Sequence, residues 1–358
     1  MRTPTHALLA ATLVAGVLIS ANAVTSGAQT ANAASRAARY AKMRPGQLMP
    51  GYRSASDIAI TANGRHALVL QGGTDGSGLV RVRLTKAPPR VTGVNRNFDI
   101  DVNSHIAIRG RYAYIAQQEE VVVARIDRKR PRIVRVVHFP YDVGEIAVAG
   151  KRPWLYVAER VGYQGRLRIL RIGKRGTLRK AGRTRLVDYD GFGVAPGGNR
   201  LLLDVNGRVR VYSLRHPRKP KKVGRNITLI RHGEAKFAFT RNGRFVYVLV
   251  GGASASGVVK VNVNRRRAVR RRTVRVGPGD IALARRGRRI LVVDSTASPS
   301  EGSNYLLNPR LRTTRKLRRP MCYPSAVAVS LRGRTKDRFY TVDSGFCSRA
   351  RIWPLRPR

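Results

Sequence analysis

The sequence predicts an all-β protein, a seven-bladed β-propeller of four-stranded antiparallel blades. Seven times, a short apolar strand with a small central residue is followed by a turn glycine and a second apolar strand. The turn glycines are 46, 40, 48, 45, 44 and 46 residues apart, which is the length of one propeller blade. Alternating apolar and polar residues follow, without helical periodicity. The first strands are expected at residues 58–60, 106–108, 146–148, 192–194, 237–239, 281–283 and 327–329.

The other strands of each repeat follow in a regular order. Third strands alternate between apolar and polar residues, as in 80–84 and 208–212. The Asn206-Gly207 pair before the second of these supplies the positive φ angles that a tight hairpin needs. Basic turns such as 127–131 and 216–220 then lead into a fourth strand. The repeats begin near residues 57, 105, 145, 191, 236, 280 and 326.

The last repeat ends after its third strand, near residues 351–353. A propeller commonly closes by taking the missing strand from the other terminus, which removes an unpaired sheet edge. We therefore expect an N-terminal strand, around residues 39–43 or 47–49, to complete the seventh blade. The propeller then spans residues 39–358.

The N-terminus predicts export. Residues 1–6 carry one arginine, residues 7–21 are apolar, and Ala21-Asn22-Ala23 is a small-residue cleavage site. The apolar run is shorter than the ~20 residues of a membrane-spanning helix, so a signal peptide is expected over residues 1–23. A second possible cut follows Ala33, and residues 24–38 are expected to be a flexible segment. The mature protein is thus expected to be extracellular, with its charge able to retain it at the cell envelope.

The two cysteines, Cys322 and Cys347, flank the first two strands of the seventh repeat. Antiparallel neighbours place the start of one strand beside the end of the other, so the two thiols can meet. In an exported protein a disulfide is the expected outcome, stabilising the fold by ~3 kcal/mol through loop entropy.

Strands such as 122–127, together with the basic turns, resemble the LVIVD and YVTN types of bacterial propeller repeat. The resemblance runs from about Asp57 to the C-terminus. It implies a secreted β-propeller, and because these repeats occur both in lactonase-like enzymes and in surface-binding proteins, it implies no single activity.

The net charge is +52, from 71 basic and 19 acidic residues. A net charge of this size must be screened or bound by a partner, either an anionic polymer or an anionic membrane surface. The propeller register assigns two sets of turns to each face. We call the face with the turns after second strands and before first strands the top face, and the other the bottom face. All acids except Asp127 and Asp337 fall on the top face.

Basic clusters fall on the bottom face. We predict that they bind a polyanion, because the arginine fork grips phosphate or carboxylate through two hydrogen bonds. The predicted polyanion-binding residues are Arg218, Lys219, Lys221, Lys222, Arg265, Arg266, Arg267, Arg285, Arg286, Arg288 and Arg289.

Acidic and imidazole side chains precede several first strands, where the channel mouth of the top face is expected. Carboxylates and imidazole converging on an axis suit a divalent cation or a base for ester or lactone hydrolysis. The candidate cation ligands are Asp57, His105, Glu145 and Asp280, and the candidate catalytic residues are Glu145, Asp280 and His105. The alternative is structural: these groups cap strand ends and bind loop amides, and Lys236 among them favours that interpretation.

Two functions are compatible with the sequence. The preferred one is a secreted binding module without a catalytic site or cofactor, which docks through its bottom face on an anionic envelope or extracellular polymer. Its top face is then left for a cation or a protein partner. The alternative is a propeller hydrolase of the lactonase or esterase type. Aromatic residues are only 6% of the chain, so bases would lack stacking platforms, and sequence-specific nucleic-acid binding is not expected. We expect a monomer.

Overall fold

A computed structural model describes most of the chain from residue 47 onward. The chain divides into two units, residues 1–44 and 45–358, and every described residue belongs to the second unit. The expected signal peptide and the segment 24–38 lie outside the described residues, as do Cys322 and Cys347. The described ranges are 47–48, 54–72, 77–85, 89–98, 100–101, 103–150, 152–161, 164–185, 189, 191–229, 233–251, 256–274, 277, 279–284, 287–295, 304–317, 324–330, 332, 336–343 and 351–355.

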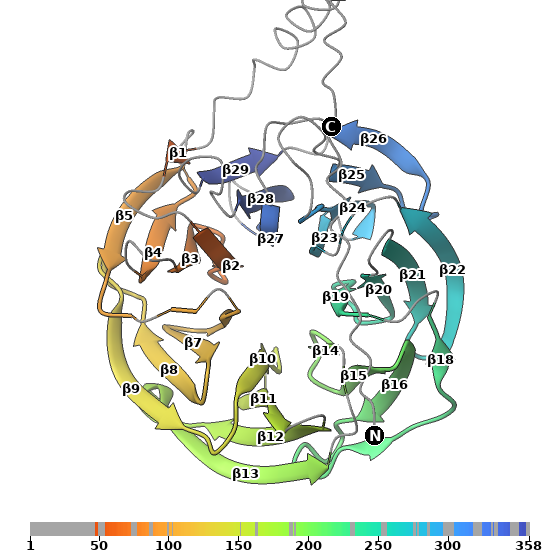
Figure 1. The fold of residues 1–358 in the computed structure, drawn as a ribbon, viewed down its shortest axis with the longest axis horizontal. Helices are drawn as coiled ribbons and strands as arrows, with labels where there is room; N and C mark the ends of the chain where they lie inside the picture. The colour runs from red at the N-terminus through yellow and green to blue at the C-terminus, as the bar shows by residue number, and fades with distance from the viewer. Residues whose placement is uncertain are drawn as a thin grey trace, which may run out of the picture. The chain divides into compact units, whose positions relative to one another are not determined.

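The strands form antiparallel sheets arranged as blades around a common axis, with first strands innermost and fourth strands at the circumference (Figure 1). An all-β propeller with four-stranded antiparallel blades is thereby confirmed. Blade 1 contains β2 (Ser54–Ile60), β3 (His66–Gly72), β4 (Gly78–Arg83) and β5 (Arg90–Asn95). Blade 2 contains β6 (His105–Arg109), β7 (Tyr112–Gln117), β8 (Glu120–Arg125) and β9 (Arg132–His138). Blade 3 contains β10 (Val143–Val148), β11 (Trp154–Val161), β12 (Gln164–Ile172), the 3-10 turn η1 (Lys174–Gly176) and β13 (Leu178–Arg185).

The remaining sheets follow the same order. Blade 4 contains β14 (Gly191–Val194), β15 (Arg200–Val205), β16 (Arg208–Ser213), β17 (Lys221–Lys222) and β18 (Ile227–Thr228), the last two both pairing with β16. Blade 5 contains β19 (Ala235–Phe239), β20 (Phe245–Val250), β21 (Ser256–Asn262) and β22 (Arg267–Val274). Blade 6 contains β23 (Ile281–Ala284), β24 (Arg289–Val292), β25 (Asn304–Leu307) and β26 (Thr313–Leu317). The last sheet contains β27 (Pro324–Ser330), β28 (Arg338–Asp343), β29 (Arg351–Leu355) and β1 (Gln47–Leu48).

A small residue at the centre of each first strand lies directly opposite a large residue of the second strand. The seven pairs are Ala59–Leu68, Ala107–Tyr114, Ala147–Tyr156, Gly193–Leu202, Ala238–Tyr247, Ala282–Leu291 and Ala328–Tyr340. The large partners are all buried. Directly opposed residues on a strand pair share one face of the sheet, so the small residue makes room for the tyrosine or leucine beside it. This explains the small-residue centre of the repeat.

Main-chain hydrogen bonds confirm how the turns are distributed between the two faces. On the top face, Phe139 N–H donates to Glu119 O and Val143 N–H to Gln118 O, which ties a turn after a second strand to the entry of the next blade. On the bottom face, Ile126 N–H donates to Arg111 O, which joins the two bottom turns of blade 2. Gly64, Gly110, Gly150, Gly198, Gly243 and Gly287 adopt positive φ in the turns after first strands, as the repeat requires.

The outer strands carry a recurrent β-bulge. The register of blades 1, 2, 3, 5 and 6 skips one residue of the fourth strand at an equivalent point. Val134 and Val269 are two of the skipped residues, and both are more than 40% exposed. Bulges and charged side chains on an outer strand discourage pairing with another chain.

The last sheet takes its outer strand from the N-terminal part of the chain. β1 pairs antiparallel with β29, with Gln47 opposite Ile352 and Leu48 opposite Arg351. One of the two expected regions, 47–49, is therefore the one that pairs. In the same sheet, Pro324 lies opposite Asp343, and the two cysteines flank this pair in the sequence. The disulfide stays a prediction. Within the described residues, no helix is long and apolar enough to cross a membrane.

Deleting residues 36–56 should lower the melting temperature of the mature protein, because β29 would lose its outer neighbour β1 and the sheet would gain an exposed edge. The deletion also removes part of β2, so a milder variant is needed, with Gln47 and Leu48 both replaced by proline, which cannot donate to the sheet ladder. Circular dichroism melting of both variants measures the effect. A proline variant that melts with the wild type would show that the β1–β29 pairing contributes no stability.

Candidate functional site

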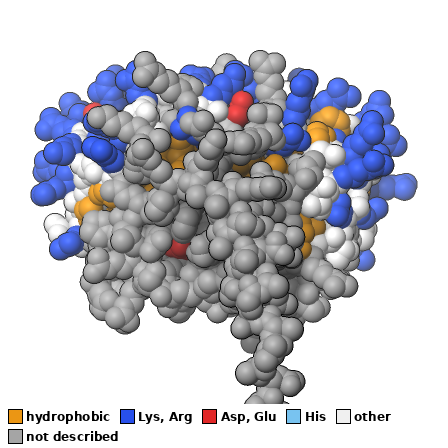
Figure 2. Space-filling model, turned by 90° about the horizontal axis from the view of Figure 1, so that it is seen from above, with side chains coloured by type: hydrophobic (Ala, Val, Ile, Leu, Met, Phe, Trp, Pro, Cys, Tyr) orange, Lys and Arg blue, Asp and Glu red, His pale blue; other side chains and the backbone are white. Residues whose placement is uncertain are grey.

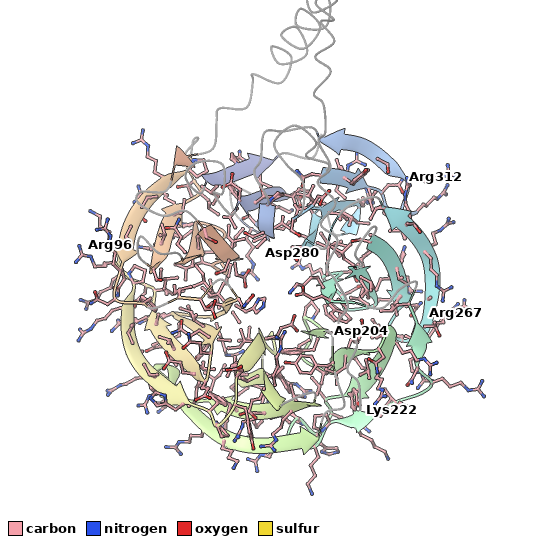
Figure 3. All side chains as sticks on the ribbon, in the orientation of Figure 1. Arg96, Asp204, Lys222, Arg267, Asp280 and Arg312 are labelled. Carbon is pink, nitrogen blue, oxygen red and sulfur yellow. The ribbon has the colours of Figure 1, made fainter. Side chains whose placement is uncertain are left out.

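Three carboxylates at the top ends of first strands each bind the backbone of the next blade. Asp57 accepts from Ile106 N–H of blade 2 at 2.9 Å, and also from its own neighbour Ile58 at 2.7 Å. Asp280 repeats this arrangement with Val327 of the last sheet, at 2.9 Å, and with Ile281, at 2.7 Å. These carboxylates therefore connect adjacent first strands around the axis, and Figure 3 shows Asp280 on the inner side of the ring.

Glu145 makes the third connection and also binds a cation. Its Oε2 accepts from Phe192 N–H of blade 4 at 2.8 Å, while its Oε1 lies 3.4 Å from Lys236 Nζ of blade 5. Lys236 Nζ also lies 2.5 Å from Glu234 Oε1. Burial alone would lower the pKa of Lys236, but the carboxylates of Glu145 and Glu234 outweigh it and raise that pKa. Lys236 is therefore a fixed cation among the acids.

Glycines in the first strand of blade 4 let the Lys236 side chain of blade 5 pass that strand and reach Glu145 of blade 3. Gly191 stands where other blades carry Asp57, His105 or Asp280, and a Cβ there would collide with the carbonyl of Ala235. A Cβ at Gly193 would lie 2.7 Å from Cβ of Phe237. The Gly-x-Gly of this strand therefore serves the close packing of blades 4 and 5.

The four candidate cation ligands do not form one cluster. His105 Nδ1 lies 3.6 Å from Asp57 Oδ2, but Glu145 binds Lys236 and Asp280 binds backbone amides. Among the described residues, no group of three His, Cys, Asp or Glu side chains lies close enough together to hold a metal ion. The contacts that these residues make correspond to the structural alternative, strand caps and backbone links. The candidate catalytic residues Glu145, Asp280 and His105 belong to these separate contacts.

Burial raises the pKa of Asp280 to about 6, with a further contribution from Asp57, although two backbone amides and Lys236 act in the opposite direction. The carboxyl group therefore changes its protonation state near neutral pH. Because this group also links two blades, its titration is expected to act on stability.

The predicted polyanion-binding residues lie on the bottom face and on the circumference. Arg218, Lys219, Arg265 and Arg266 occupy exposed turns, and Arg288 is exposed before β24. Lys221, Lys222 and Arg267 belong to the outer strands β17 and β22, so they lie on the circumference, as Figure 3 shows for Lys222 and Arg267. These three residues directly follow the basic turns that precede the fourth strands. Arg289 begins β24, and Arg285 and Arg286 lie outside the described residues.

Other basic residues hold the blades together. Arginine side chains donate to main-chain carbonyls of the next blade, a role that sequence analysis missed because no acidic partner marks it. The bonds are Arg81 Nη1 to Arg128 O at 2.7 Å, Arg109 Nη1 to Gly150 O at 2.6 Å, Arg152 Nη1 to Leu214 O at 2.9 Å and Arg272 Nη1 to Leu311 O at 2.6 Å. Within single blades, ion pairs join Arg111 and Arg125 to Asp127 in blade 2, and Arg168 to Glu159 in blade 3.

Solved structures confirm the fold and do not identify a function. No family model matches the sequence, and no curated protein matches it. A functionally unknown protein from Desulfotomaculum acetoxidans is 14% identical, with a TM-score of 0.62, covering 76% of this chain and 87% of its own. The β-propeller domain of Cps50 (Swd1) from Myceliophteria thermophila is 14% identical, with a TM-score of 0.64, covering 87% and 100%. Hydrazine synthase from Kuenenia stuttgartiensis is 13% identical, with a TM-score of 0.61, covering 88% and 98%. The class of protein is the β-propeller, and at these identities the likeness is one of fold.

Replacing Glu145 with alanine should lower the free energy of unfolding by about 2 kcal/mol, because both the Phe192 amide and Lys236 lose a half-buried partner. Glu234→Ala is the matched control. Its side chain is 56% exposed, so the loss should stay below about 1 kcal/mol. Urea unfolding of the two variants measures the difference. Equal losses would contradict the role given to Glu145 in joining blades 3, 4 and 5.

Asp280 should make the protein less stable as the pH rises from about 4 to about 6. An unfolded aspartate titrates near ~3.9, so in this window the folded state holds the proton more tightly and loses stability as it is released. Asp280→Asn should remove that part of the pH dependence, about 2–3 kcal/mol between pH 4 and pH 7. Urea midpoints of wild type, Asp280→Asn and the exposed control Asp142→Asn test this. A wild-type slope retained in Asp280→Asn would contradict it.

Proposed function

We propose that this protein is a secreted, seven-bladed propeller, closed by its N-terminal strand, that binds an anionic polymer of the cell envelope or extracellular space. Binding uses the basic rim, which we define as the exposed residues Arg218, Lys219, Lys221 and Lys222 of blade 4 and Arg265, Arg266 and Arg267 of blade 5. The observation that carries the proposal is that these cations adjoin one another on the outside of the ring.

Contacts between blades make the basic rim continuous. A Cβ on Gly224 of blade 4 would lie 2.6 Å from Cδ of Arg266 in blade 5, so the outer segments of the two blades touch. On the other side, a Cβ on Gly182 of blade 3 would lie 2.5 Å from Arg218 O. The exposed Arg179 and Lys180 of β13 extend the surface into blade 3. An extended polymer crossing these blades would therefore meet cations along its length.

Neighbouring arginines contribute to the pKa shift of a half-buried histidine on the bottom face. Burial together with Arg81, Arg83 and Arg65 lowers the pKa of His66, at the bottom end of β3, to about 4. In Figure 2, Lys and Arg side chains line the upper edge and both sides of the view, with few Asp and Glu side chains among them. A surface with so few counter-charges within the protein favours an external polyanion over internal pairing.

An anionic polymer accounts for these features better than a flat membrane. The basic rim curves around the circumference (Figure 3), so a membrane would touch few of its cations at once, whereas a flexible chain can follow it. Arginine also suits the repeated phosphate or carboxylate groups of such a polymer, since its planar fork donates two parallel hydrogen bonds.

The salt dependence of binding tests the role of the basic rim. Long-chain polyphosphate is the probe, and the affinity should fall log-linearly with salt concentration as counterions are released. Replacing Lys219 and Arg265 with glutamine should reduce the magnitude of this slope by roughly one for each side chain that contacts a phosphate.

The matched control is Arg96→Gln with Arg160→Gln, which removes the same charge from exposed positions at the top ends of β5 and β11. This control should change the slope little. Equal changes in both variants would show that a diffuse field, rather than the basic rim, does the binding. Stronger binding to vesicles of anionic lipid than to the polymer would favour a membrane partner and overturn the choice of polymer.

A further inference from the structure

A pocket of about 380 Å³ opens on the bottom face where blades 3 and 4 meet. One wall comes from the turn after the first strand of blade 3, and the rest comes from the two bottom turns of blade 4. Its lining residues are Arg152, Asn199, Arg200, Ser213 and Arg215. Three of the five carry guanidinium groups, and none carries a carboxylate.

Two of the arginines are held in place by the protein itself. Arg152 Nη1 donates to Leu214 O at 2.9 Å, so this side chain is fixed across the blade boundary. Arg200 Nη1 donates to Ser213 Oγ at 3.3 Å and to Asn199 O at 3.2 Å. Both side chains are half-buried. Because each bond uses one terminal nitrogen of a guanidinium that has several N–H groups, the arginines are oriented and retain donors for a ligand.

The remaining lining groups complete a set of hydrogen-bond donors. Arg215 is exposed at the pocket, and its backbone N–H donates to Ser213 Oγ at 3.4 Å. The hydroxyl of Ser213 thus accepts from both the Arg200 side chain and the Arg215 backbone, and Asn199 also lines the pocket. Side chains that are already ordered lose less entropy on binding, so this arrangement favours a small anion.

The number and origin of the arginines indicate the shape of that anion. A planar carboxylate has two oxygens, which a single arginine fork satisfies. Three guanidinium groups that come from two turns and the start of β15 suit a tetrahedral group with acceptor oxygens in several directions. The volume lies near the lower end of the range for ligand pockets, which fits one phosphorylated unit and not a length of polymer.

We propose that this pocket binds a single phosphate group, with Arg152, Arg200 and Arg215 as its ligands and Ser213 and Asn199 as supporting donors. The inference rests on the proposed function and deepens it, since it makes the polymer a phosphate polymer and gives one of its units a defined site beside the basic rim. The unit is either a terminal phosphate monoester or an internal phosphodiester, and both share the chemistry that the pocket recognises.

Binding of inorganic phosphate to the full mature chain tests the pocket directly. Isothermal titration calorimetry at constant ionic strength should show one saturable site. The double variant Arg200→Gln with Arg215→Gln should weaken it at least tenfold. Arg132→Gln with Arg135→Gln removes the same charge from exposed positions on the outer strand β9 of blade 2 and should weaken it less than twofold. Equal weakening in the two variants, or no saturable site in the wild type, would overturn the proposal.

Two further probes identify the ligand. Glycerol 1-phosphate and a glycerol phosphodiester distinguish a terminal from an internal phosphate, and tighter binding of either supports the pocket. Sulfate that binds as tightly as phosphate would overturn the assignment to phosphate. A third variant, Arg200→Lys, keeps the charge but not the fork, and should recover less than half of the lost binding free energy.

The failure of this inference can be told apart from the failure of the proposed function. If polyphosphate binds with the salt slope expected for the basic rim while inorganic phosphate finds no saturable site, the pocket is overturned and the polymer-binding function stands. If polyphosphate does not bind either, both are overturned. Circular dichroism melting of each variant confirms that the loss comes from the site and not from unfolding.

Discussion

The close approach of the first strands around the axis is the constraint on which the ring depends. Each first strand must pack against its own second strand and also against the neighbouring blades in a narrowing space. The repeat meets this by placing alanine or glycine opposite a buried tyrosine or leucine, as in Ala107–Tyr114 and Gly193–Leu202. In blade 4, the neighbouring first strand lies so close to Gly191 and Gly193 that a Cβ at either position would collide with it. Small residues at these positions are therefore required by packing.

The polar side chains near the axis follow from the same constraint. First strands of adjacent blades do not pair as a sheet, so the amides at their top ends need other partners. Asp57, Glu145 and Asp280 supply them from the preceding blade. A carboxylate can accept several hydrogen bonds, which lets Asp57 and Asp280 cap their own strands as well. The acids of the channel mouth are thus part of the fold, and Lys236 pairs with Glu145 and Glu234.

Because most of the described acids lie on the top face, the rest of the described surface is left mainly to arginine and lysine. Part of this basic population is structural, since Arg81, Arg109 and Arg272 bind carbonyl oxygens of the next blade in place of carboxylates. Neutral acceptors leave the charge of each arginine uncancelled. The protein therefore combines a tight ring with a strongly positive exterior, and the proposed ligand supplies the counter-charge that the chain itself lacks.

The sequence by itself determined the strand repeat, the turn glycines and the distribution of charge between two faces, because these depend on residues close together in the chain. It also identified polar residues before several of the first strands. Only the tertiary structure decided what those residues do, since Glu145 meets Phe192 and Lys236 from other repeats. The same holds for the arginine pocket, where Arg152 joins Arg200 and Arg215 across a blade boundary. Contacts between repeats depend on the angle and register at which blades pack, and no local pattern encodes them.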